Sequence, residues 1–155
     1  MTEAAETQVA KHTSETLPSR VKHEHIFEAL CAAQAEFLPV RKNCTAKISK
    51  TSEAIRKYAD LGEILSATRP ALNRHGIYLY QTVESNAQGV IVETVLAHES
   101  GETIQSGKLF MPSAGTGNMT GAQAFGSART YACRYSISSF LGIGFVIKTA
   151  VPMKP

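Results

Sequence analysis

A chain of 155 residues with 43% hydrophobic and 19% charged residues is long enough for one domain with a hydrophobic core, and its net charge of +3 is mild. No apolar run approaches the roughly 20 residues of a membrane-spanning helix, and the polar N-terminal segment does not resemble a secretion signal. The three cysteines are widely spaced and form no CxxC pair, which argues against a disulfide framework and a zinc site and favours reduced thiols.

The first part of the chain is expected to contain an arm, a helix and a basic loop. Residues 1–21 lack periodicity, which predicts a flexible N-terminal arm. Apolar residues at helical spacing over 26–37 predict a helix that Pro39 stops. The basic stretch 40–59 has no clean period, and we expect an extended or mobile loop with a helical turn near Glu53.

The next helix has clear end signals. Asp60 is an N-cap residue, and Glu63 follows at the spacing of a capping box. Pro70 is expected to kink or divide this helix, and Gly76 is well placed to end it.

The hydrophobic period then changes to two, which is typical of strands. Three strands are predicted over 77–84, 89–98 and 102–110, joined by short turns at SNAQ and ESG. These connections are too short for parallel crossovers, so the strands should form an antiparallel meander.

A final helix is predicted from about Ala122 to Leu141, after a glycine-rich loop. One of its faces carries Phe125, Ala128, Ala132, Tyr135 and Ser139, and the opposite stripe carries Gln123, Ser127, Thr130, Arg134 and Ser138. The order of elements indicates an α+β fold, in which a three-stranded antiparallel meander packs against helices. We expect a single domain over 22–148, followed by a C-terminal tail over 149–155.

Charge is segregated along the chain. All 13 acidic residues lie at or before Glu102, so the last third of the sequence is purely basic. A second basic block, between Arg41 and Lys57, contains only Glu53 as a counter-charge. Such segregation favours a polyanionic partner. The alternative is that acidic segments fold against basic ones.

The sequence offers little for catalysis. The glycine-rich loop AGTGNMTGAQAFGSA lacks the GK[ST] of a P-loop and follows an antiparallel meander, so it is not a nucleotide-binding fingerprint. The five histidines show no metal-ligand spacing, and the final helix has no carboxylates to pair. We therefore expect no enzymatic activity, no cofactor and no metal, and His98 is expected to be solvated or structural.

Two clusters combine cations with tyrosine rings, as sequence-independent binding of single strands requires. The candidate contacts in the basic block are Lys42, Lys47, Lys50, Arg56, Lys57 and Tyr58. Those in the final helix are Arg129, Tyr131, Arg134 and Tyr135.

The residues of the final helix also allow structural roles. Helical tyrosines are commonly core residues, and we favour the core for Tyr135 because it shares a face with Ala128 and Ala132. Arg134 lies on the polar stripe, which favours contact with phosphate. Arg129 projects nearer the apolar side and could pair with a carboxylate such as Glu93.

These residues together resemble the ERF (essential recombination function) family of phage single-strand annealing proteins, over most of residues 26–143. The most specific mark is GSARTYACRYSISSFLGI, residues 126–143. The other marks, in chain order, are Tyr58, Asp60-Leu61, Leu72, Gly76, Gln81, His98, Ser100-Gly101-Glu102 and Pro112. In two places the chain departs from the family pattern: Cys133 stands where relatives often have a second arginine, and GFVIKTAVPMKP replaces an acidic run.

The resemblance implies ATP-independent annealing of complementary single strands in phage recombination, in the bacterial cytoplasm. It also implies a strand–strand–strand–helix core and homo-oligomers in the form of rings or filaments. Further implied partners are a phage exonuclease or a host single-strand binding protein, and no membrane is involved. Two other functions stay open, a protein that protects single strands without annealing them and a basic protein-interaction module.

Overall fold

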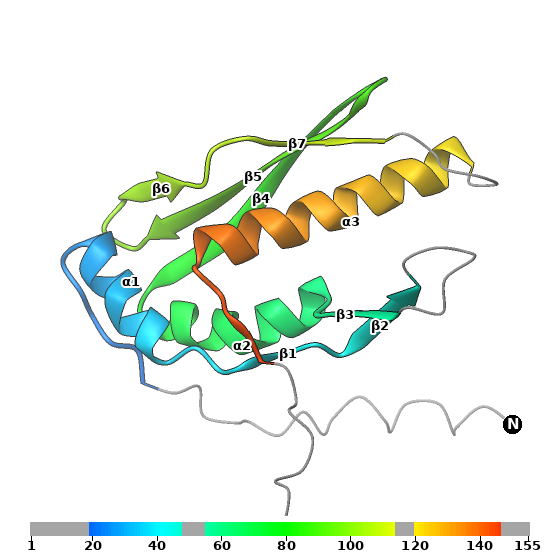
Figure 1. The fold of residues 1–155 in the computed structure, drawn as a ribbon. Coiled ribbons are helices and arrows are strands. Elements are labelled where there is room, and N and C mark those ends of the chain that lie inside the picture. The colour runs from blue at the N-terminus through cyan, green and yellow to red at the C-terminus, as the bar shows by residue number, and fades with distance from the viewer. Residues whose placement is uncertain (1–18, 48–54, 114–119, 147–155) are drawn as a thin grey trace, which may run out of the picture.

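A computed structural model describes residues 19–47, 55–113 and 120–146. The fold is α+β, with helices packed on antiparallel sheets, as expected (Figure 1). In the described residues, no helix is long and apolar enough to cross a membrane.

The first two helices pack against each other and begin and end close to the expected residues. Helix α1 spans Ile26–Ala35, and α2 spans Leu61–Arg74. The Asp60 side chain accepts a hydrogen bond from the backbone N–H of Glu63, which confirms the predicted N-cap. Gly76 follows the end of α2 with a φ of 73°, a conformation that glycine adopts without strain.

Helix α2 continues through Pro70, so the expectation that proline divides it is wrong. Proline removes one backbone donor and leaves the carbonyl of Ser66 without its helical partner. Both residues lie on the exposed side of α2, where water can bind that carbonyl.

The main sheet is built around β5 (Gly89–His98), which pairs with β4 (Ile77–Asn86) on one side. The third strand was expected over 102–110 but is broken into β6 (Thr103–Gln105) and β7 (Leu109–Pro112), both paired with β5. At the break, the hydroxyl of Ser106 accepts from Thr94 N, and Gly107 has a φ of 80°. The chain therefore bends away from β5 between the two short strands.

All three helices cover the same face of this sheet. Alternate residues of β5, from Val90 and Val92 to Leu96, point towards the helices and are fully buried. Leu96 packs in a cluster with α1, α2 and the C-terminal part of helix α3, which spans Gly121–Phe140. Val90 and Val92 pack in a second cluster with the middle of α3.

The described residues of the basic stretch, for which we expected an extended or mobile loop, form paired strands. Strand β2 (Cys44–Lys47) pairs antiparallel with β3 (Ile55–Tyr58), while the predicted helical turn near Glu53 lies outside the described residues. A parallel pair joins β1 (Val40–Arg41) to β8 (Phe145–Val146) and had no signal in the sequence.

The described end of the N-terminal arm contacts the domain, whereas residues 1–18 lie outside the described residues. Arg20 forms an ion pair with Glu99 at 3.0 Å, and Val21 N donates to Arg74 O. The C-terminal tail expected over 149–155 also lies outside the described residues.

A candidate nucleic-acid interface

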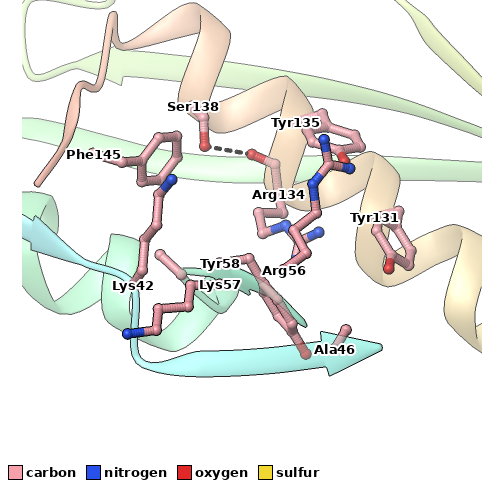
Figure 2. Close-up of a pocket in the computed structure, with 11 residues that line it drawn as sticks. Lys42, Ala46, Arg56, Lys57, Tyr58, Tyr131, Arg134, Tyr135, Ser138 and Phe145 are labelled. Atoms are coloured by element: carbon pink, nitrogen blue, oxygen red, sulfur yellow. Dashed lines mark hydrogen bonds between the residues drawn. The ribbon is translucent and has the colours of Figure 1, made fainter. Parts of the chain in front are cut away.

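An open pocket of about 270 Å³, the Arg134 pocket, lies between the β2–β3 hairpin and α3 (Figure 2). Strand β3 and helix α3 provide most of its side chains, and β8 adds Phe145. Its lining residues are Lys42, Ala46, Arg56, Lys57, Tyr58, Ala59, Tyr131, Arg134, Tyr135, Ser138 and Phe145.

Arg134 is only 7% exposed, yet within the described residues no carboxylate lies within ion-pair distance of its guanidinium. Three aromatic rings surround that guanidinium instead. Its central carbon lies 4.5 Å from the ring centre of Tyr58, 4.7 Å from that of Tyr131 and 5.4 Å from that of Tyr135. Attraction between the cation and the ring faces offsets part of the cost of removing Arg134 from water.

The hairpin makes the pocket basic. Strand alternation and register place Arg56 and Tyr58 on one face of the hairpin, with Ala46 opposite Arg56. Lys42 and Lys57 also line the pocket, and none of the described residues that line it is acidic. Several cations around a concave surface without counter-charge produce a positive potential that attracts anions.

Asp60 fixes the hairpin to the start of α2. One of its carboxylate oxygens caps α2, while the other accepts from Asn43 Nδ2 at 3.1 Å and from Cys44 Sγ at 3.7 Å. In return, Asp60 N donates to Asn43 Oδ1. The Glu63 N–H that donates to the carboxylate lowers the pKa of Asp60, and Asn43 and Cys44 lower it further, against the opposing effect of partial burial.

We expect Asp60→Ala to destabilise the protein by about 1 kcal/mol at pH 7, because it removes the cap and releases the hairpin. The carboxylate stabilises the fold fully above its ordinary pKa of 3.8, and this contribution is lost as the pH falls through the lower pKa of the folded state. In urea unfolding, the difference between wild type and Asp60→Ala should therefore shrink below pH 3.8.

The matched control is Asp60→Asn, which retains a capping oxygen and should keep most of the stability at pH 7. A difference between wild type and Asp60→Ala that does not change with pH would mean that the carboxylate is not the stabilising group.

A buried polar network sets the position of α3 on the sheet. Gln81 Nε2 donates to Thr94 Oγ1 at 2.8 Å and to Cys133 O at 2.9 Å. The hydroxyls of Thr94 and Ser136 lie 2.6 Å apart. These bonds hold the side of α3 that carries Cys133 and Ser136 against the sheet, which leaves Arg134 facing the hairpin.

One of three comparisons with known proteins found a match. The family model described as the ERF superfamily matches residues 26–144, which include the whole sheet, all three helices and most of the pocket. The chain belongs to the ERF superfamily. This membership connects the protein with strand annealing in phage recombination. Searches of curated proteins and of solved structures found no match.

Most residues that we selected from this ERF sequence lie together in the structure. Seven of them line the Arg134 pocket, namely Lys42, Arg56, Lys57, Tyr58, Tyr131, Arg134 and Tyr135. Lys47 is exposed at the end of β2 and does not line the pocket. Arg129 is exposed on α3 outside the pocket, and Lys50 lies outside the described residues.

Three expectations about α3 need correction. Tyr135 is 44% exposed rather than in the core, and Arg134 is buried rather than on a solvated stripe. The face of α3 against the sheet is instead centred on Ala128, Ala132 and Ile137.

Arg129 forms no ion pair with Glu93 in the described part of the chain. In the register of β5, Glu93 lies between the inward-pointing Val92 and Thr94, so it points to the face of the sheet opposite α3. His98, which we expected to be solvated or structural, is buried, and this favours the structural role.

Cys133 is buried against Val90 and Val92 rather than in the pocket. Burial raises the pKa of its thiol, with Arg129 opposing the effect. The cysteine that stands where relatives often have an arginine therefore removes no cation from the pocket. Within the described residues, no group of His, Cys, Asp and Glu side chains could hold a metal ion.

Sequence reasoning missed the pocket residues Ala46, Ala59, Ser138 and Phe145. Ser138 donates to Arg134 O at 2.7 Å, a bond within α3 that leaves no trace in a sequence pattern (Figure 2). Phe145 follows the helix in a segment that we treated only as a departure from the family. Its apolar character next to Gly144 is a weak signal of a packed extended segment.

Proposed function

We propose that the protein binds single-stranded DNA in the Arg134 pocket and anneals complementary strands without ATP. The observation that carries this proposal is the pocket itself, in which a buried arginine, three tyrosine rings and further cations meet and to which the described part of the chain contributes no carboxylate. A positive groove with aromatic surfaces is the combination that binds single strands regardless of sequence.

In this proposal, Arg134 acts from the inner wall of the pocket. The three rings hold its guanidinium in place, and its N–H donors are available to phosphate oxygens. Arg56, Lys57 and Lys42 extend the positive surface along the strand. The exposed sides of Tyr131 and Tyr135 provide surfaces for bases.

Annealing itself requires that the bases of the bound strand stay accessible. We propose that protomers assemble side by side in a ring or filament, so that their pockets form one continuous groove. The groove holds one strand by its backbone, and a second strand pairs with the bases. Duplex geometry then selects the correct partner, so the protein needs no catalytic group and no cofactor.

The test combines binding and pairing. We expect the affinity for fluorescently labelled dT oligonucleotides to fall at least tenfold between 50 and 200 mM salt, because phosphate contacts dominate binding. In a fluorescence energy-transfer assay, the protein should accelerate the pairing of complementary oligonucleotides.

The results also separate the alternative functions. Binding combined with slower pairing would identify a protein that protects strands without annealing them. Absence of any DNA binding at low salt would indicate a basic surface for an acidic protein partner, and the annealing proposal would then be wrong. Electron microscopy with and without oligonucleotide would establish the assembly.

A further inference from the structure

A second hollow, the α2 groove, lies between the exposed side of α2 and the start of β4, with a volume of about 880 Å³. The described residues that line the groove differ from those that line the Arg134 pocket. The two hollows come close to each other at the N-terminal end of α2, where Ala59 lines the pocket and Gly62 lines the groove. Its lining residues are Arg20, Gly62, Leu65, Ser66, Arg69, Pro70, Asn73, Arg74, Gly76, Ile77 and Tyr78.

Among the residues that the structure describes, three arginines and no acidic residue line the α2 groove. Arg69 is exposed and forms no ion pair within the described residues. Arg20 and Arg74 each contact one carboxylate oxygen, at 3.0 and 3.5 Å, which leaves several of the five N–H donors of each guanidinium available. The Nε atom of Arg74 is buried and has no hydrogen-bond partner among the described residues.

Neutral donors and an aromatic surface accompany these cations. Ser66, Arg69 and Asn73 lie along one side of α2 and extend over about 10 Å of the helix axis. Tyr78 is 65% exposed, and its ring stacks on that of Tyr80 with 5.7 Å between the ring centres. By strand alternation both rings lie on the face of the sheet opposite the helices, and of the two only Tyr78 lines the α2 groove, at the edge formed by β4. Cations next to an exposed aromatic residue fit the backbone and bases of a nucleic-acid strand.

We infer that the α2 groove binds a second single strand while the Arg134 pocket holds the first, an inference that rests on the proposed function. A strand bound on the same protomer has a high local concentration relative to the first strand. Complementary segments would then meet without diffusing from bulk solution. An acidic protein segment would satisfy the arginines, but it gives no reason for the exposed Tyr78 at the edge of the groove.

The experiment uses photocrosslinking, because a site-specific readout separates the two binding sites. The full chain is saturated with unlabelled dT oligonucleotide, and an oligonucleotide containing 5-iododeoxyuridine is added and irradiated. Mass spectrometry of the peptides then locates the adducts. We expect adducts on Tyr78 or Tyr80 that decrease about tenfold in Arg69→Ala, which removes the one arginine of the groove without a carboxylate contact.

The same variants are compared in solution. Arg69→Ala should slow annealing about tenfold while changing the affinity for the first strand by less than about twofold. Lys108→Ala is the matched control, because it removes an exposed cation that contacts Glu84 away from both sites. It should leave both the adducts and the annealing rate unchanged.

Each result has a separate meaning for the two proposals. Adducts on Tyr58, Tyr131 or Tyr135 without adducts on Tyr78 or Tyr80 would overturn the second site and leave the proposed function intact. The first site is read in a parallel irradiation without unlabelled oligonucleotide, and adducts at neither site in that sample would overturn both proposals. If polyglutamate, but not dT, binds in a manner that depends on Arg69, the groove recognises acidic protein segments and the inference of a second strand is wrong.

Discussion

Replacing Arg134 by methionine should weaken the binding of single-stranded dT about tenfold to a hundredfold while leaving the protein folded. The loss of one charge-assisted hydrogen bond to phosphate, at about 1.5–3 kcal/mol, corresponds to such a decrease. Methionine has a similar length and no charge to desolvate, so it can fill the space between Tyr58 and Tyr131. Fluorescence anisotropy at fixed salt measures the affinity, and thermal unfolding monitors the fold.

Two further variants separate charge from geometry. Arg134→Lys keeps the charge but loses the planar guanidinium that faces the rings, so it should retain only part of the affinity. Arg129→Met is the matched control on the same helix, and it should change the affinity by less than about threefold because an exposed single charge contributes little. Unchanged DNA binding in Arg134→Met, together with lower stability, would mean that Arg134 only supports the fold.

Gly89→Ala should lower the free energy of unfolding by about 1–3 kcal/mol, the usual cost of overpacking. A Cβ atom at Gly89 would overlap the carbonyl oxygen of Met111 and lie 2.9 Å from the Cα atom of Pro112. Both contacts are with the backbone of β7, which would have to separate from β5. For a domain of this size, the expected decrease in Tm is about 3–10 °C.

Gly126→Ala is the matched control, and we expect it to change the free energy of unfolding in the opposite direction. A Cβ atom there meets no atom within 4 Å, and Gly126 lies inside α3. Alanine should therefore raise the stability by about 0.5–1 kcal/mol, since glycine is a poor helix former. Equal stability of Gly89→Ala and wild type in urea unfolding would show that β7 does not pack this closely on β5.

Local signals were sufficient to predict the helices and the main hairpin. The N-cap at Asp60 depends only on hydrogen bonds to nearby backbone, and strand alternation in β4 and β5 follows from one buried face. The third strand was predicted incorrectly because its break depends on a contact between Ser106 and Thr94 of another strand. Gly107 is a local signal of the break, because a glycine inside a strand pattern often marks a bulge, but it does not identify the contact with Thr94.

The residues of the pocket were predicted better than their environments. Clustering of cations and tyrosines identified seven of the eleven lining residues, because composition alone indicates a polyanion-binding surface. Helical periodicity could not place Arg134 and Tyr135 correctly, since α3 packs on the sheet with one side and on Tyr58 with another. A single hydrophobic stripe is the expected pattern only for a helix with one packed face.

The pairing of β1 with β8 determines when the Arg134 pocket can form during synthesis of the chain. Phe145 lies opposite Val40, so one wall of the pocket comes from the beginning of the described chain and another from its end. Contacts between such distant residues form late, because the intervening chain must be ordered first. A chain emerging from the ribosome therefore completes the Arg134 pocket, the proposed DNA-binding surface, only after nearly all of the domain has been translated.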